Sequence, residues 1–269
     1  MNIQPIGIFD SGVGGLTVAR AVADALPGYP MVYFGDTAHL PYGEKSPELI
    51  QRYARRITEE LLSMGCGSIV IACNSASSNA LGVVQSMAGP HVPVIDVVHP
   101  VIDEVSSRFA QGRIGVIGTR ATVSSGWYQQ LLADRGFEVI AKATPLLASA
   151  IEEGFHEGRV SSALIEAYLG DDAFESLDAL ILGCTHYPLI RDQIAAQLPP
   201  RVALMDSAAA VARALKSTLA DSGSMEANDA PGHRRFLVSD LTQSFALGAQ
   251  RFFGSSIQLE HRPLPMVTP

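Results

Sequence analysis

Two of the three cysteines stand where an apolar run ends and polar residues begin. Cys73 ends the run "SIVIAC", and Cys184 ends the run "ALILGC". A cysteine thiolate acts as a base or a nucleophile, and its pKa falls near cations and at helix N-termini. A single cysteine in such a place is often a small buried hydrophobic side chain. Two in matched settings favour a pair of acid–base groups, and we assign Cys66, which lacks this setting, to packing.

The residues after each cysteine carry hydrogen-bonding side chains. Asn74 and Ser75 follow the first thiol, and Thr185 and His186 follow the second. At the start of a helix, such side chains and free backbone N–H groups bind carboxylates, although they also serve as ordinary N-caps. An imidazole two residues from a thiol can lower the thiol pKa or carry its proton. We therefore expect both thiols at helix N-termini, with lowered pKa values.

Asp10 is a third candidate for chemistry. It follows the apolar run "IGIF" and precedes the glycine-rich segment "SGVGG". A carboxylate in this place is suited to orient a substrate amine or a neighbouring thiol. The glycine-rich segment lacks the Lys-Ser/Thr ending of a phosphate-binding loop and the glycine spacing of a dinucleotide-binding turn. We therefore predict a tight turn that binds no nucleotide.

Two further segments carry polar residues with less defined roles. The segment "GDTAHLPYGEKS" places Asp36, Tyr42 and Gly43 in a turn-like region, where the tyrosine either closes a pocket or packs. Glu152 and Glu153 form an acidic pair, for which we favour a solvated helix end over a catalytic pair. The sequence has no CxxC or HExxH motif, so we expect no metal. It also has no obvious lysine in a pyridoxal-phosphate setting, so we expect no cofactor of that kind.

The elements that must position these residues read as alternating strands and helices. Continuous apolar runs are typical of strands buried on both faces of a parallel sheet, and their alternation with amphipathic segments favours an α/β fold. In such sheets, ligands bind beyond the carboxyl ends of the strands, where both thiols lie. Strands are predicted at 6–10, 31–36, 68–73, 92–98, 113–119, 137–143, 179–184 and 202–206. Helices are predicted at 46–64, 161–170 and 189–197.

The sequence also repeats its pattern. Gly7 precedes Cys73 by almost the same number of residues as Gly115 precedes Cys184. We therefore predict two pseudo-symmetric three-layer α/β domains with mainly parallel sheets. One thiol from each domain would face the cleft between them, and the active site would lie in that cleft.

The predicted domain boundaries follow from this repeat. The first domain comprises residues 1–97 and 208–269, because we expect the tail to return and pack on the first unit. The second domain comprises residues 98–207. The small polar segment 221–235 contains glycine and proline and is predicted to be a loop.

The composition limits the classes of protein that fit. With 269 residues, 47% of them hydrophobic, the chain can bury a large core. No window is apolar enough for a membrane helix, and the N-terminus does not resemble a secretory signal. We therefore expect a cytoplasmic protein with free thiols and no membrane partner. The formal charge of −8 argues against a nucleic-acid partner.

Four blocks, in their order and spacing, resemble glutamate racemases of the aspartate/glutamate racemase superfamily. They are "FDSGVGGLTV", "GDTAHLPYGEKS", "ACNSAS" and "LGCTHYPLI", and "RIGVIGTRATV", "IEEG" and "MDSAAAVA" extend the similarity over nearly the whole chain. The resemblance implies a cofactor-independent cytoplasmic isomerase that converts L-glutamate to D-glutamate for peptidoglycan. It also implies two α/β domains with the site at their interface, often in a homodimer.

The resemblance further implies roles for individual residues. Cys73 would remove the α-proton of D-glutamate and Cys184 that of L-glutamate, while Asp10 and His186 would assist them respectively. The implied substrate contacts are Asp10, Ser11, Tyr42, Gly43, Asn74, Ser75, Thr185 and His186. The expected accessory residues are Asp36, Glu152, Thr119 and Thr122.

This chain departs from the family pattern in places. Ser75 replaces the usual threonine, which keeps the hydroxyl and loses a methyl group, and "LLASAIEEG" is less apolar than usual. The N-terminus is short, so we expect no requirement for a cell-wall precursor as activator.

Three other functions remain open at the level of sequence. The first is a racemase of aspartate or a related acidic substrate. The second is a hydrolase in which Cys184 attacks and His186 is its base, which leaves Cys73 unexplained. The third is a module that binds a diacid without chemistry.

Overall fold

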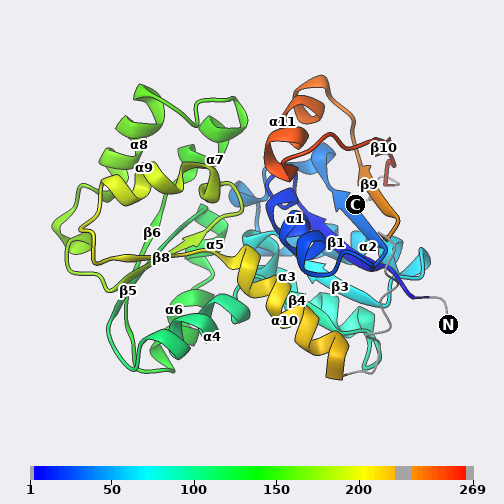
Figure 1. The fold of residues 1–269 in the computed structure, drawn as a ribbon, viewed down its shortest axis with the longest axis horizontal. Coiled ribbons are helices and arrows are strands. Elements are labelled where there is room, and N and C mark those ends of the chain that lie inside the picture. Colours follow the sequence, from blue (N-terminus) through cyan, green and yellow to red (C-terminus); the bar gives the residue numbers. More distant parts are fainter. Residues whose placement is uncertain (1–2, 222–231, 265–269) are drawn as a thin grey trace.

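Two parallel β-sheets form the centre of the structure, a computed structural model that describes residues 3–221 and 232–264 (Figure 1). The larger sheet has the order β10-β9-β2-β1-β3-β4 and the smaller has the order β6-β5-β7-β8. The strands of the larger sheet are β1 (Ile6–Asp10), β2 (Met31–Gly35), β3 (Ser68–Ile71), β4 (Val94–Asp96), β9 (Arg234–Val238) and β10 (Leu259–His261). Those of the smaller are β5 (Arg113–Gly118), β6 (Glu138–Ala143), β7 (Ala179–Gly183) and β8 (Ala203–Met205).

Helices cover both faces of the sheets. Helices α8 and α9 lie on one side of the smaller sheet, and α4 and α6 lie on the other (Figure 1). The helices are α1 (Leu16–Ala25), α2 (Pro47–Ser63), α3 (Asn74–Ala88), α4 (His99–Arg108), α5 (Arg120–Ser124), α6 (Trp127–Ala133), α7 (Pro145–Glu152), α8 (Arg159–Leu169), α9 (Arg191–Ala196), α10 (Ser207–Asp221) and α11 (Gln243–Phe253). Four short 3-10 helices are η1 (Thr37–His39), η2 (Tyr42–Glu44), η3 (Asp172–Phe174) and η4 (Tyr187–Ile190).

The strands confirm the α/β prediction. All eight predicted strands are present, and the pairings recorded within the described residues are parallel. Strands β1, β3 and β7 are buried along their whole length, which is why their sequences are continuously apolar. Strands β9 and β10 were missed, because "RRFLV" begins with two charged residues and "LEH" is short and polar. The predicted loop 221–235 falls mostly outside the described residues.

Helix α2 illustrates how the sequence determines where a helix begins and which face of it is buried. Its N-terminus is capped by Ser46, whose side chain accepts from the Leu49 N–H, and Pro47 occupies the first turn. The residues at three- to four-residue spacing are buried and form the face that packs against the core. These residues are Ile50, Ala54, Ile57, Thr58 and Leu61. The helix lies against α3, and Cys73 stands at the N-cap position of α3.

The two sheets share a topology. The order β2-β1-β3-β4 in one corresponds to β6-β5-β7-β8 in the other. Cys73 follows β3, and Cys184 follows the equivalent strand β7. Helix α10 carries the chain back from the second sheet and packs on α1 and α4, and β9 then pairs with β2. Two α/β halves are thus confirmed, while the boundaries at 97/98 and 207/208 stay a prediction.

Candidate active site

One pocket gathers the carboxyl ends of strands from both sheets. Each sheet contributes one thiol, Cys73 from the first and Cys184 from the second. The pocket lining also contains residues that the sequence did not single out for substrate, namely Leu40, Pro41, Ala148 and Ser149. The lining residues expected from sequence are Asp10, Ser11, Tyr42, Gly43, Cys73, Asn74, Ser75, Thr119, Glu152, Cys184, Thr185 and His186. The expected residues thus come together, and Asp36 and Thr122 lie behind the pocket wall.

Cys73 occupies the N-cap position of α3, as predicted, but its pKa moves in the opposite direction to our expectation. Burial raises the pKa of the thiol to about 12, and the nearby Asp10 carboxylate adds to the effect. The N–H groups of Ala76 and Ser11 oppose this rise, and Ser11 Oγ lies 3.8 Å from the sulfur. Loss of water therefore outweighs the helix terminus. The thiol holds its proton at neutral pH and is a strong base once it loses it.

Cys184 belongs to a hydrogen-bonded triad. Its sulfur lies 3.5 Å from His186 Nδ1, and His186 Nε2 lies 2.7 Å from Glu152 Oε1. Burial alone lowers the pKa of the imidazole, but the Cys184 thiolate and the Glu152 carboxylate raise it well above its ordinary value. Contact with these two groups therefore favours the positively charged form of the imidazole.

Two expectations about this side of the pocket need correction. Glu152 is not part of a freely solvated helix end, because it lies at the end of α7 and contacts His186. The chain after Cys184 forms the short 3-10 helix η4 before α9 begins at Arg191. The second thiol therefore does not stand at an α-helix N-terminus, and the imidazolium replaces the expected helix dipole.

Asp10 is held by the turn that follows it. Its Oδ2 accepts from Gly12 N at 2.9 Å and from Gly15 N at 3.0 Å, and the Tyr33 hydroxyl donates to Gly12 O at 2.6 Å. The other oxygen, Oδ1, is buried and has no hydrogen-bond partner among the described residues. Burial raises the pKa of this carboxyl. A buried acceptor without a partner is suited to a ligand donor.

Asn74 offers the complementary group. Its Oδ1 accepts from the Tyr128 hydroxyl at 2.8 Å, while its Nδ2 is buried and unpaired within the part of the chain that the structure describes. An amide donor on one side and the carboxylate Oδ1 of Asp10 on another match the carboxylate and the ammonium of an amino acid. Both side chains line the same pocket.

A cluster of three hydroxyls joins the two halves at the pocket. Ser75 Oγ lies 2.8 Å from Thr119 Oγ1, which lies 3.0 Å from Thr122 Oγ1. Thr119 also caps α5 through the Thr122 N–H. Ser75 therefore forms a hydroxyl–hydroxyl hydrogen bond with Thr119. It lacks the methyl group that the usual threonine would carry at this position.

The pocket has no basic side chain other than the histidine. Within residues 3–221 and 232–264, none of the lining residues is Lys or Arg. The described residues also contain no group of three or more His, Cys, Asp or Glu arranged for a metal. Anionic groups on a ligand would be bound by backbone N–H groups, hydroxyls, Asn74 and the His186 imidazolium.

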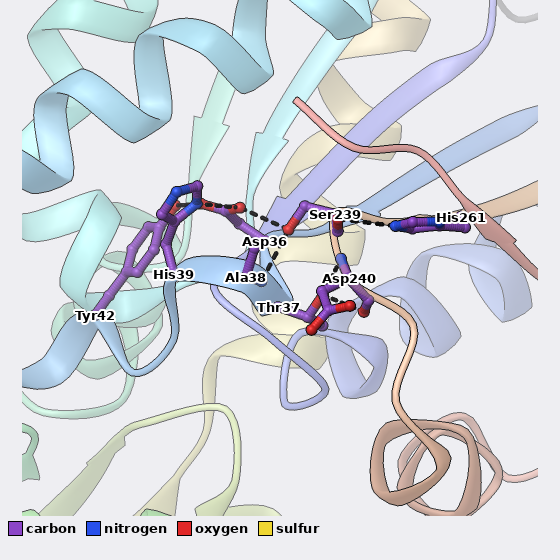
Figure 2. A network of polar contacts seen from close by, with 8 residues as sticks. All are labelled: Asp36, Thr37, Ala38, His39, Tyr42, Ser239, Asp240 and His261. Carbon is purple, nitrogen blue, oxygen red and sulfur yellow. Dashed lines mark hydrogen bonds and ion pairs between the residues drawn. The ribbon is translucent and has the colours of Figure 1, made fainter. Parts of the chain in front are cut away.

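Tyr42 lines the pocket, but its hydroxyl is already engaged. It donates to Asp36 Oδ2 at 2.5 Å (Figure 2). The ring therefore forms part of the wall, and Asp36 acts on the pocket only through this contact.

Replacing Gly43 with alanine is expected to raise KM about tenfold. A Cβ at this position would lie 2.7 Å from Thr119 Cβ and 2.8 Å from its Cγ2, so the loop and α5 must move apart. Gly82→Ala in α3 is the matched control, because a Cβ there meets no atom within 4 Å and alanine favours the helix. Steady-state kinetics on both variants test this, and an unchanged KM in Gly43→Ala would contradict it.

Comparison with known proteins gives one consistent result. The family model described as Asp/Glu/Hydantoin racemase matches residues 16–215. A glutamate racemase from Chlorobaculum parvum is 42% identical over 258 residues, which cover 95% of this chain and 94% of the relative. The glutamate racemase of Francisella tularensis, solved with D-glutamate, has a TM-score of 0.91 and 35% identity, covering 98% and 99% of the two chains. The Escherichia coli glutamate racemase, solved with L-glutamate and the activator UDP-MurNAc-ala, has a TM-score of 0.75 and 28% identity, covering 98% and 100%.

Proposed function

The chain belongs to the Asp/Glu/Hydantoin racemase family, and from that premise we propose that Cys73 and Cys184 are the two acid–base groups of its reaction. The protein is a glutamate racemase, an isomerase that interconverts L- and D-glutamate and so supplies D-glutamate for peptidoglycan. One observation carries the assignment: two thiols at the ends of equivalent strands, one from each sheet, line a single pocket.

In the reaction, one proton is removed from the α-carbon of the substrate and another is added to its opposite face. The Cys184 thiolate removes the α-proton of L-glutamate, and the Cys73 thiol donates its proton to the other face. D-glutamate leaves a Cys73 thiolate and a Cys184 thiol, and the reverse reaction starts from that state. The raised pKa values of Cys73 and His186 support a resting state prepared for L-glutamate, with the first thiol protonated and the second paired with an imidazolium.

The remaining lining residues bind and stabilise the substrate. The free Oδ1 of Asp10 accepts from the substrate ammonium, and Nδ2 of Asn74 donates to a carboxylate. Removing the α-proton places negative charge on the α-carbon and its carboxylate, and fixed donors in a pocket with little water stabilise this charge most. Ser11, Ser75 and Thr185 supply further donors of this kind.

The test uses purified protein with L-glutamate in D₂O and no added cofactor. We expect the α-proton signal to disappear in NMR while the circular dichroism of the same sample decays to zero. L-aspartate in a parallel sample is expected to remain unchanged. Retained binding without α-proton exchange, or reaction of aspartate alone, would contradict the proposal and favour a binding module or an aspartate racemase.

We further propose that the enzyme is a cytoplasmic homodimer without nucleic-acid or membrane partners. The reaction needs only a small soluble substrate, and among the described residues no helix is long and apolar enough to cross a membrane. Light scattering coupled to size-exclusion chromatography tests the dimer, and a monomer at micromolar concentration would contradict it.

A further inference from the structure

Ser239 lies outside the pocket but is linked to its wall. It follows β9, beyond the residues 16–215 that match the family model, and it is buried. Its hydroxyl donates to Asp36 Oδ1 at 2.8 Å and accepts from Ala38 N at 3.0 Å (Figure 2). The serine and the aspartate are 203 positions apart in the sequence. A residue of the C-terminal segment therefore contacts the loop that carries Tyr42.

Asp36 collects hydrogen bonds on both of its oxygens. Besides Ser239, it accepts from Tyr42 Oη at 2.5 Å and from His39 Nδ1 at 2.8 and 3.0 Å. The carboxylate is completely buried, so these donors replace water. Burial and the Asp36 charge raise the pKa of Tyr42 well above its ordinary value. The phenol therefore stays protonated and always donates.

Other hydrogen bonds hold Ser239 and Asp240 against the loop at Asp36 and against β10, independently of the serine hydroxyl. Ser239 N donates to Gly35 O at 3.0 Å, and His261 Nε2 lies 3.2 Å from Ser239 O. Thr37 Oγ1 donates to Asp240 O at 2.5 Å and accepts from Asp240 N at 2.7 Å. These contacts remain when the hydroxyl of Ser239 is removed. What the hydroxyl adds is its hydrogen bond to Asp36 Oδ1, which fixes the orientation of the carboxylate, and the hydrogen bond that it accepts from Ala38 N.

We propose that Ser239 is a positioning residue for substrate binding, which acts through Asp36 to hold Tyr42 in the pocket wall. The inference rests on the proposed function of that pocket. Without the hydroxyl, Asp36 rotates more freely, and the loop at Tyr42 and Gly43 occupies its binding-competent position less often. Apparent affinity falls in proportion to that population. Loss of binding that is equal in ground and transition states raises KM and leaves kcat unchanged.

Ser239→Ala is the first variant for the test. We expect KM for L-glutamate to rise about tenfold, as the loss of one hydrogen bond to a charged group implies, with kcat within about twofold of wild type. Ser239→Thr keeps the hydroxyl and is expected to restore the wild-type KM. Thr37→Val is the matched control, because it removes a neighbouring tie between the same segments without touching Asp36. Its KM is expected to stay within about twofold of wild type.

Tyr42→Phe removes the hydrogen bond from the Tyr42 hydroxyl to Asp36, on the opposite side of the carboxylate from Ser239. We expect a similar rise in KM, and we expect Ser239→Ala to add nothing further in that background, because both act through one carboxylate. Melting temperatures of all variants separate this effect from loss of folding. An unchanged KM in Ser239→Ala, an equal rise in Thr37→Val, or independent multiplication of the two effects would overturn the inference. Racemase activity of the wild type tests the proposed function separately, so failure of one is distinguishable from failure of the other.

Discussion

Cys73→Ala and Cys184→Ala are each expected to lower kcat/KM for glutamate racemisation by at least about 10³-fold. Each thiol is the proposed proton donor or acceptor on one face of the substrate, and loss of a positioned acid or base costs about 10²–10⁴-fold. The proposed reaction needs both, so a single thiol cannot complete an inversion. Because the enantiomers have equal free energy, kcat/KM must fall equally in the two directions.

Circular dichroism with each enantiomer as substrate measures this loss. The double variant is expected to be no slower than either single variant, because the two thiols act as a unit. Cys66→Ala is the matched control, since that thiol is buried in the core beside Gly7 and outside the pocket. Its turnover is expected to stay within about twofold of wild type. Full turnover in Cys73→Ala would instead support chemistry by Cys184 alone.

Asp10→Asn is expected to lower kcat/KM about 10²-fold while stabilising the ligand-free protein at neutral pH. The activity falls because the free Oδ1 of Asp10 is the group proposed to accept from the substrate ammonium. An asparagine keeps an acceptor for the N–H groups of Gly12 and Gly15. It removes a buried negative charge whose Oδ1 has no hydrogen-bond partner among the described residues.

The direction of the stability change follows from the pKa of Asp10. Burial raises this pKa above its ordinary value of 3.8. Between the ordinary and the raised value, the folded chain holds a proton that the unfolded chain releases, so stability falls as pH rises through this window. Above the window the wild type bears the full cost of the ionised carboxyl, whereas the asparagine variant does not titrate. The gain should therefore be present at pH 7.5 and absent below about pH 3.8.

Thermal unfolding without glutamate, at neutral and at acid pH, measures this difference. For a chain of this size, 1 kcal/mol corresponds to roughly 2–4 °C in Tm, so a moderate gain is readily detected. Asp24→Asn is the control, because that carboxylate is exposed and forms a surface ion pair with Arg20. A lower Tm for Asp10→Asn at pH 7.5 would contradict the cost that burial assigns to this group.

The two proposed bases, Cys73 and Cys184, differ in the groups that surround them. Cys73 is buried and lies near the Asp10 carboxylate, and both effects raise its pKa to about 12. Cys184 contacts an imidazolium that Glu152 holds in place. The two thiols of the proposed pair therefore lie in unequal surroundings, one beside a carboxylate and the other beside an imidazole. The α-proton of an amino acid is a weak acid, and a base of high pKa suits its removal.

Local pattern alone determined eight of the ten described strands and the location of the chemistry. Continuous apolar runs predict buried parallel strands, and ligands bind at the carboxyl ends of such strands. Cys73, Cys184 and Asp10 therefore reached one pocket in the structure as predicted. The similarity of the two halves was visible because equivalent strands keep equivalent spacing. These properties depend on residues close in sequence, so the sequence by itself was sufficient.

The tertiary structure decided which distant residues pair with one another and how burial shifts the pKa values of the site residues. Glu152 contacts His186 across 34 positions, and Ser239 reaches Asp36 across 203, so neither pairing has a local signal. Strand β9 is recognisable only by its pairing with β2. The thiol pKa of Cys73 was predicted in the wrong direction, because the helix terminus is a local feature whereas desolvation depends on everything packed around the sulfur.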